Sequence, residues 1–162
     1  MGVLDRRFIN DLMRRVDKYI MTNDNCIFCK IINGQEPACF LYRDEFCSAF
    51  LDIQPVNPGH TLVIPNLHCE SFLDLSPEIS GRLINIAQII AGALGNSSIR
   101  CEGINLVLAD GEAAGQEVFH THLHIIPRNQ GDGFGFRFGN RYFNRPSRDE
   151  LERVAEIIRK GL

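Results

Sequence analysis

The chain has 162 residues, 44% of them hydrophobic, which is enough for one buried core and too little for two ordinary domains. Its formal net charge of -3 gives no electrostatic reason to expect nucleic-acid binding, which would need a basic face, so an anionic ligand has to be held by local groups. Without a secretory signal or an apolar run of membrane-spanning length, we expect a cytoplasmic protein with reduced cysteines and no membrane partner.

Residues 5–20 predict an amphipathic N-terminal helix, because their apolar side chains recur at helical spacing and their arginines and lysine lie mostly elsewhere. A basic polar face suits a membrane surface or a partner protein. Packing of this helix on its own domain or on a dimer mate is the favoured interpretation.

The rest of the chain predicts an antiparallel α+β domain with a long helix packed on its sheet. Ser76, Pro77 and Glu78 form a helix start, and Gly95 or Asn96 can end that helix. Beyond the core, residues 129–162 hold a glycine-rich segment and a last helix opened by the capping box of Ser147 and Glu150. The expected strands are residues 39–43 and 46–51 as a hairpin, 61–64, 104–108 and 118–126.

Three of the five histidines lie at His120, His122 and His124, two residues apart in the last expected strand. This spacing puts their rings on one face of the strand. Each ring needs a partner, because a buried unpaired imidazole costs roughly 1–3 kcal/mol. The spacing alone leaves three interpretations open: a metal site with three imidazole ligands, a nucleophilic histidine with polar neighbours, or a structural hydrogen-bonded row.

The small-residue loop before the histidines is a candidate phosphate cradle. Gly111 and Gly115 leave backbone amides that an anion can approach closely, and Gln116 adds a neutral donor. Such a loop is more often a tight turn. Its position beside the histidines favours the nucleophile interpretation.

Cys26 and Cys29 have the two-residue gap that presents both thiolates to a tetrahedral zinc ion. His68 and one ring of the histidine row can complete a structural site with two cysteines and two histidines. The remaining four cysteines are expected to be small buried thiols.

The pattern HTHLHII, with AGQEVF before it and DIQPVNPGHTLVIPNLH about fifty residues earlier, resembles the histidine triad nucleotide hydrolases and transferases. The resemblance covers residues 26–128. It implies a homodimer that joins two sheets across its two-fold axis, whereas the single domain expected over residues 1–162 follows from the length of the chain. It also implies hydrolysis or transfer at the α-phosphate of a purine nucleotide, either a phosphoramidate or a dinucleoside polyphosphate. A nucleotide-binding sensor or interaction module with little catalysis is the alternative.

The resemblance also implies residue roles. His122 would attack the α-phosphorus and carry a covalent nucleotidyl group, supported by His124, His60 and the backbone around Gly115. Gln116 would lie near the leaving-group atom, and Asp52 would bind the ribose hydroxyls. The residues implied for a purine slot are Ile27, Phe28, Ile31, Phe50 and Leu62, and those implied for a structural zinc ion are Cys26, Cys29, His68 and His120.

One departure concerns Ala109, which stands where many relatives have Asn or Gln. This difference leaves the choice between phosphoramidate and dinucleotide substrates open.

Overall fold

The computed structural model describes residues 23–162, which fall into two compact units with the boundary after Asp132. Each unit is described by itself. The helix expected over residues 5–20 lies outside the described residues, and the single-domain organisation stays a prediction.

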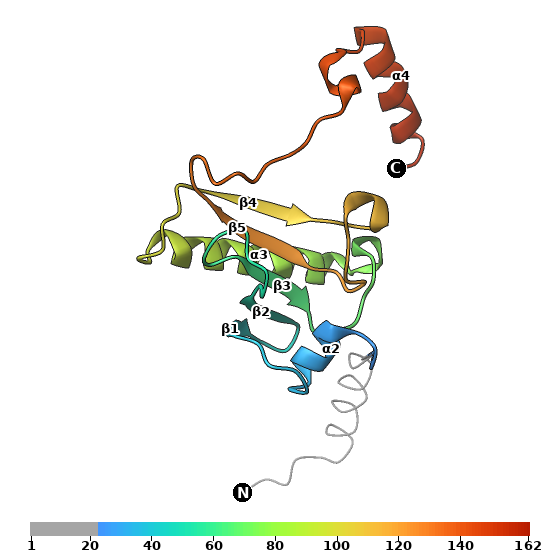
Figure 1. The fold of residues 1–162 in the computed structure, drawn as a ribbon. Helices are drawn as coiled ribbons and strands as arrows, with labels where there is room; N and C mark the ends of the chain where they lie inside the picture. Colours follow the sequence, from blue (N-terminus) through green and yellow to red (C-terminus); the bar gives the residue numbers. More distant parts are fainter. Residues whose placement is uncertain (1–22) are drawn as a thin grey trace, which may run out of the picture. The chain divides into compact units, whose positions relative to one another are not determined.

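The first unit is built on a five-stranded antiparallel sheet with the strand order β1-β2-β3-β5-β4 (Figure 1). The expected hairpin is present and is closed by Asp44, whose carboxylate accepts hydrogen bonds from the amides of Phe46 and Cys47. The strands are β1 (Phe40–Arg43), β2 (Cys47–Leu51), β3 (Thr61–Pro65), β4 (Gly103–Leu108) and β5 (Leu123–Arg128).

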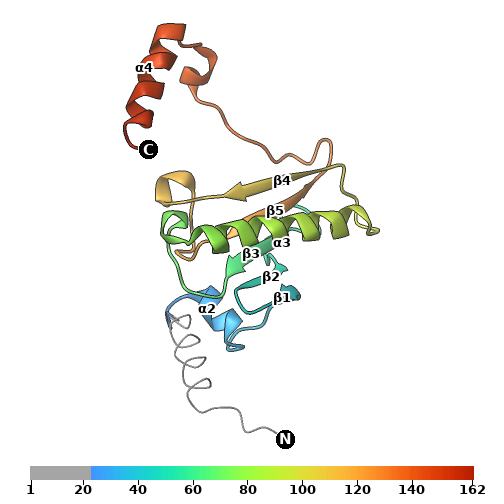
Figure 2. The same ribbon diagram turned by 180° about the vertical axis from the view of Figure 1, so that it is seen from behind.

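Helix α3 (Pro77–Gly95) covers one face of this sheet and contacts β2, β3 and β5 (Figure 2). Ser76 caps it as expected, because its hydroxyl accepts the amide proton of Ile79. Its buried stripe of Leu83, Ile86, Ala87, Ile90 and Leu94 packs with Val63, Leu123 and Ile125 of the strands.

The short helix α2 (Ile27–Ile32) belongs to a separate apolar cluster on the other side of the strands. Its Phe28 and Ile31 pack with Phe50, Leu62 and Ile64. Because successive strand residues point to opposite faces, these strand residues face away from α3. His124 pairs with Leu62 across the β3–β5 ladder and therefore shares the α2 face.

Strand β5 begins at Leu123, so the expected strand over residues 118–126 was wrong in its first half. The neighbouring strand β3 ends at Pro65, which has no amide proton to donate to a ladder. The His120 amide instead donates to the carbonyl of Val118. Of the three motif histidines, only His124 lies in a strand.

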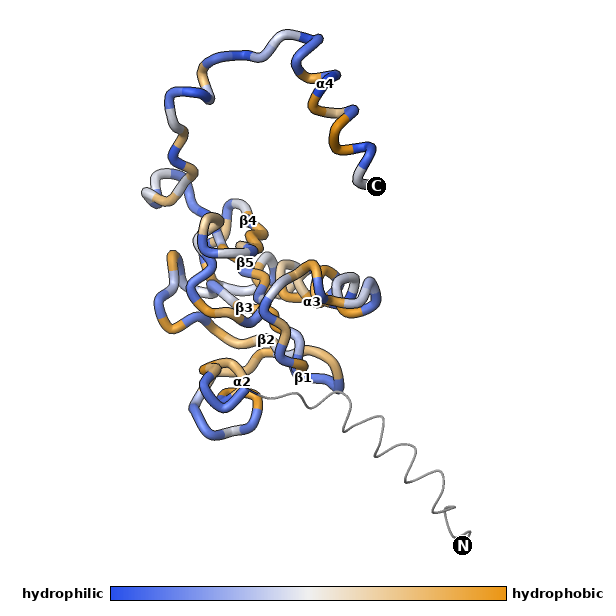
Figure 3. The backbone as a smooth tube through the Cα atoms, turned by 90° about the vertical axis from the view of Figure 1, so that its right-hand side faces the viewer, coloured by the Kyte–Doolittle hydropathy of each residue, from blue (hydrophilic) through white to orange (hydrophobic). Residues whose placement is uncertain are grey.

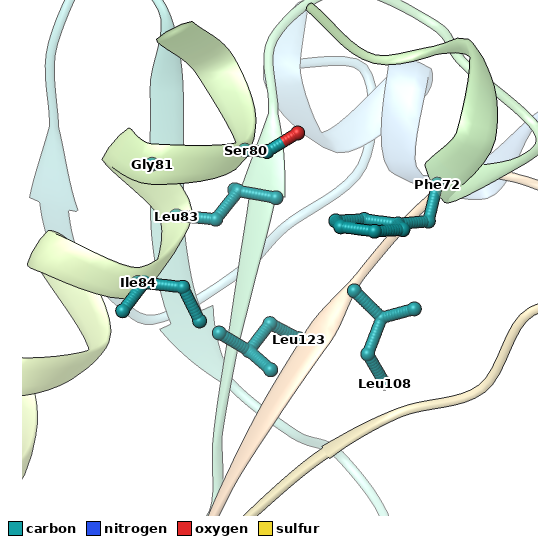
Figure 4. A pocket seen from close by; sticks show the side chains of 7 residues that line it. All are labelled: Phe72, Ser80, Gly81, Leu83, Ile84, Leu108 and Leu123. Carbon is teal, nitrogen blue, oxygen red and sulfur yellow. The ribbon is translucent and has the colours of Figure 1, made fainter. Parts of the chain in front are cut away.

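A cavity of about 420 Å³ lies between α3 and the sheet, on the face opposite His124 (Figure 4). Its walls are apolar side chains from α3, from β4 and β5, and from the 3₁₀ turn over Phe72–Asp74. The lining residues are Phe72, Ser80, Gly81, Leu83, Ile84, Leu108 and Leu123. This cavity holds no polar group that could take part in phosphate chemistry, apart from one serine.

The second unit, Gly133–Leu162, contains a 3₁₀ turn over Asn140–Phe143 and helix α4 (Arg148–Arg159). The expected capping box is present, since Ser147 and Glu150 exchange side-chain to backbone hydrogen bonds. Apolar residues recur along α4 between polar ones (Figure 3). None of the helices within residues 23–162 is both long and apolar enough to span a bilayer.

Candidate active site and metal centre

All five histidines of the chain lie in one row of ring contacts. At one end His68 packs edge-on against His120, with 5.2 Å between ring centroids. Phe28 of α2 contacts both His120 and His122, at 5.8 and 5.3 Å. The ring centroid of His124 lies 4.9 Å from that of His122. His60 ends the row, with its ring centroid 5.1 Å from that of His124.

His122, in the middle of the row, is 95% buried and is held by a backbone oxygen. Its Nδ1 lies 2.7 Å from the carbonyl oxygen of His120. A carbonyl can only accept, so Nδ1 carries the proton and donates it. The lone pair of a neutral His122 ring is therefore on Nε2, which is the form that a nucleophilic or general-base nitrogen needs.

A chain of hydrogen bonds fixes the tautomers of His60 and His124. The Val56 amide donates to Nδ1 of His60 over 3.2 Å, so His60 carries its proton on Nε2. That Nε2 donates to Nδ1 of His124 over 2.9 Å. His124 consequently presents an N–H at Nε2, a donor suited to a phosphate oxygen.

Burial keeps both supporting rings neutral. It lowers the pKa of His124 to about 4, and the neighbouring His122 and His60 lower it further. Burial also lowers the pKa of His60, against the opposing effect of the Asp52 carboxylate. Neutral rings preserve the tautomers that the hydrogen bonds select.

Asp52, just beyond the end of β2, lies beside this end of the row. Its Oδ2 is 3.6 Å from Nδ1 of His60 and 3.9 Å from Nδ1 of His124. Its Oδ1 accepts the amide proton of Gln54 over 2.8 Å. These three side chains could approach one cation together, but the lone pair of His60 Nδ1 already accepts the Val56 amide, which favours hydrogen bonding over metal binding.

The other end of the row forms a candidate metal centre. The side chains of Cys26, Cys29, His68 and His120 bring one potential ligand atom each within 4.8 Å of one another. Nδ1 of His120 lies 3.5 and 3.7 Å from the two sulfurs, and Nδ1 of His68 lies 3.4 Å from Cys29 Sγ. Tetrahedral zinc, with bonds of about 2.3 Å to sulfur and 2.0 Å to nitrogen, places such ligands about 3.5 Å apart. The donor set and its spacing fit zinc.

The second nitrogen of His120 is committed elsewhere, which orients the ring for metal binding. Nε2 lies 2.9 Å from the Pro65 carbonyl oxygen and donates to it, so the lone pair is on the Nδ1 that faces the sulfurs. Burial lowers the pKa of His120 to about 4, which keeps that lone pair free of a proton. Burial also raises the pKa of the Cys29 thiol, and a bound cation would reverse that effect.

The loop that was expected to cradle phosphate binds largely to itself. The amides of Ala114 and Gln116 donate to the Gly111 carbonyl, and the Gly115 amide donates to the Glu112 carbonyl. Gly111 and Gly115 have φ angles of 86° and 88°, the left-handed region in which glycine is favoured. The glycines thus shape a tight turn over Glu112–Ala114.

Gln116 is buried and braces this loop. Its Oε1 accepts the Gly111 amide proton over 2.7 Å, and its Nε2 donates to the carbonyls of Glu70 and Val118 over 2.8 and 3.2 Å. In this structure the amide therefore ties the loop to the segment that leads into His120. No hydrogen bond to His122 accompanies these among the described residues.

The residues expected to line a purine slot gather on the α2 face. Phe28, Ile31, Phe50 and Leu62 are all buried in the α2 cluster, and Phe28 packs edge-on against Phe50 at 5.7 Å. Ile27 is 41% exposed, so it is the member with most surface left for a ligand.

Several groups that position the site escaped the sequence reasoning. The carbonyl of Pro65 and the amide of Val56 orient rings through the backbone, so no side-chain pattern reports them. Asp110 joins the loop after β4 to the segment after His68, by accepting from the Ser71 hydroxyl and the Phe72 amide. All six cysteines are unpaired. Of the four expected to be buried, only Cys47 is buried, whereas Cys69 and Cys101 are partly buried and Cys39 is exposed.

Comparison with known proteins identifies relatives with the same motif-bearing region. The family model described as the HIT domain matches residues 33–131. An uncharacterized HIT-like protein of Borreliella burgdorferi is 51% identical over 119 residues, which are 72% of this chain and 85% of that protein. The adenylylsulfatase HINT3 of Arabidopsis thaliana is 38% identical over 118 residues, 73% of this chain and 59% of that protein.

Solved structures show the same fold. A HIT family protein from Bacillus anthracis is 43% identical with a TM-score of 0.78, covering 87% of this chain and 99% of that one. A zinc-bound histidine triad family protein from Mycobacterium smegmatis is 41% identical with a TM-score of 0.66, covering 80% of this chain and 88% of that one. The expected antiparallel α+β fold is confirmed, and the chain belongs to the histidine triad (HIT) family.

Proposed function

We propose that this protein is a hydrolase or transferase that acts at the α-phosphate of purine nucleotides through a covalent nucleotidyl group on His122. The observation that carries the proposal is the hydrogen bond from Nδ1 of His122 to the His120 carbonyl. It leaves the Nε2 lone pair without a proton and fixes the plane of the ring. A histidine held in this way can attack phosphorus without first being deprotonated.

In the first step, Nε2 of His122 attacks the α-phosphorus. A P–N bond forms, the bond from phosphorus to the leaving group breaks, and the leaving group departs with the bonding electron pair and takes a proton from water. The Nε2–H of His124 donates a hydrogen bond to a phosphate oxygen as charge develops there. His60 contributes by holding His124 in that tautomer.

In the second step, water attacks the same phosphorus. A P–O bond forms, the P–N bond to His122 breaks, and the water releases a proton to solvent as the nucleoside monophosphate leaves. The lone pair returns to Nε2 of His122. Another acceptor in place of water would make the reaction a transfer.

The carboxylate of Asp52 and the side-chain amide of Gln116 have different roles in this proposal. Asp52 accepts hydrogen bonds from the ribose hydroxyls, which a carboxylate can do with both oxygens. Gln116 holds the loop of Gly115 against the segment that carries the histidines, and so sets how closely a leaving group can approach. Within the proposed purine slot, Ile27 has the largest exposed fraction and Phe28 contacts the ring of His122.

A structural zinc ion would be held by Cys26, Cys29, His68 and His120. It would stiffen the segment from which His122 projects and take no part in the chemical steps. The ring contact of Phe28 with both His120 and His122 links the metal centre to the nucleophile.

The proposed substrates are nucleoside phosphoramidates and dinucleoside polyphosphates. A relative is named adenylylsulfatase, which supports hydrolysis of an adenylyl compound by this chain as well. The shared requirement is an adenylyl or guanylyl group whose α-phosphorus bears a good leaving group.

Turnover of an adenosine phosphoramidate and a diadenosine polyphosphate by the wild type and by His122→Asn tests the proposal. We expect the variant to fold normally and to lose turnover by about 10⁴-fold or more, as nucleophile removal does in other enzymes. Full activity of a folded His122→Asn variant on every substrate would refute the nucleophile. Tight AMP binding by a wild type without any turnover would favour a nucleotide sensor.

We also propose that the protein acts as a cytoplasmic homodimer joined along β4. This strand is at the edge of the sheet and exposes Leu106, so it offers unpaired backbone groups and apolar surface to a second copy. Sedimentation of the wild type and of Leu106→Lys checks the proposal. A monomeric wild type would contradict it.

A further inference from the structure

Helix α4 has an apolar stripe that nothing in its own unit covers. Leu151, Val154, Ala155 and Ile158 follow the spacing i, i+3, i+4, i+7 and so share one face of the helix. Leu151, Val154 and Ile158 are between 51% and 60% exposed, and Ala155 is the one residue of the Gly133–Leu162 unit that is partly buried rather than exposed. A helix of this length is marginal in water without tertiary packing. A partner for the stripe is therefore needed.

The stripe is symmetric about the point between Val154 and Ala155. Reversing the direction of the helix about this point exchanges Leu151 with Ile158 and Val154 with Ala155. An antiparallel neighbour with the same sequence would therefore present an apolar residue at each height where this helix presents one. A parallel neighbour in register would do so as well, so the charges on α4 decide the direction.

The charges on α4 have opposite signs at its two ends, which favours the antiparallel arrangement. Asp149 and Glu150 lie in the first turn, whereas Arg159 and Lys160 lie at the other end. Antiparallel pairing brings the acidic end of each helix to the basic end of the other, and also opposes the two helix dipoles. Parallel pairing would set like charges side by side.

We infer that α4 is a docking surface for α4 of a second copy of this chain, paired antiparallel about the Val154–Ala155 midpoint. The ion pair of Arg159 with Glu152, 3.0 Å long, flanks the stripe and limits the side-chain freedom at its edge. Helix α4 has four acidic and three basic residues, so it has no excess positive charge that would draw it to an anionic membrane. This inference is independent of the proposed catalytic function.

Cysteine cross-linking tests the pairing and its direction. Packed helices lie about 8–10 Å apart, which brings facing Cα atoms within the roughly 7 Å limit for a disulfide. In the antiparallel pair Leu151 faces Ile158 of the other copy. Two Leu151 residues would be separated by about 10 Å along the axis, which is too far.

The experiment mixes full-length Leu151→Cys and Ile158→Cys proteins under mild oxidation and quantifies linked tryptic peptides by mass spectrometry. The peptide masses distinguish these links from any that involve native cysteines. We expect the mixed link to exceed either self-link by about ten-fold, as the disulfide distance limit requires. Arg153→Cys, on the opposite face of α4, is the matched control and should form no link to itself.

Two results would overturn the inference. A self-link of Leu151→Cys as abundant as the mixed link would show parallel pairing. Links no more abundant than those of the Arg153→Cys control would show that something other than α4 of a second copy covers the stripe. The substituted positions are all exposed in α4, so the variants should fold like the wild type.

Discussion

The two ends of the histidine row use the same side chain for different chemistry. At the His120 end, the ring donates to a carbonyl through Nε2 and turns an unprotonated Nδ1 toward two thiols. At the His124 end, Nδ1 accepts from another imidazole, and the proton is left on Nε2. His122 between them donates through Nδ1 and keeps its Nε2 lone pair. The partner of the second nitrogen, and not the residue type, decides the task that each ring can perform.

The largest expected effect concerns the metal end. Cys29→Ser removes a ligand of the proposed zinc centre, and we expect the free energy of unfolding to fall by about 3 kcal/mol or more, because metal binding is coupled to folding. Chemical denaturation with and without a chelator measures it. The exposed Cys39→Ser is the matched control and should be neutral.

A chelator that leaves the stability of the wild type unchanged would contradict a structural zinc ion. Loss of turnover in zinc-free protein that is still fully folded would instead indicate that the metal takes part in the chemistry.

A smaller effect is expected at the other end of the row. His60→Ala removes the donor to His124 Nδ1, so the tautomer that presents Nε2–H is no longer enforced. We expect kcat to fall by about 10–100-fold with little change in KM, since the lost hydrogen bond orients a transition-state donor. Steady-state kinetics on the substrate that the wild type turns over best measures this.

Asp52→Asn is the informative comparison for that experiment. Substitution of a residue that binds ribose should change KM more than kcat. Asp52→Asn should therefore mainly raise KM, whereas His60→Ala should mainly lower kcat. If His60→Ala keeps the wild-type kcat, the proposed role of the Val56, His60 and His124 chain is wrong.

The smallest expected effect is a pH dependence of stability. The pKa of His124 is about 4 in the folded protein against an ordinary value of 6.5. Between these values the unfolded chain binds more protons, so the free energy of unfolding should fall as the pH decreases from 6.5 to 4. The slope is at most about 1.4 kcal/mol per pH unit for this ring. Urea denaturation across this range should show a shallower slope for His124→Asn, and an equal slope would contradict the assigned shift.

Most of the fold could be predicted from the sequence, because local signals carry it. The Ser76 cap, the helix it opens and the capping box of Ser147 and Glu150 lie where the pattern placed them. The alternation through Val118 to Leu123 was misleading, since a strand also needs a neighbour to pair with. Pro65 ends that neighbour, and its carbonyl accepts from a histidine ring instead.

The sequence predicted which residues gather at the metal centre, but it did not predict how the histidine rings are oriented. The spacing of Cys26 and Cys29 indicated a metal pair, and the structure brings both to His68 and His120. The tautomers could not be predicted, because they depend on the His120 carbonyl, the Val56 amide and the Pro65 carbonyl, and backbone groups leave no signal in a side-chain pattern. The composition of the loop around Gly115 suggested a cradle for an anion. In the structure, the amides of Ala114, Gly115 and Gln116 donate hydrogen bonds within the turn.

Mass spectrometry of the protein during turnover tests the central claim most directly. Rapid acid-free quenching with a slowly hydrolysed adenylyl substrate should reveal a species heavier by one adenylyl group, and peptide analysis should locate that group on His122. His122→Asn should show no such species under the same conditions. An adduct on another residue, or rapid turnover in which no adduct forms at any time, would contradict a nucleophilic His122.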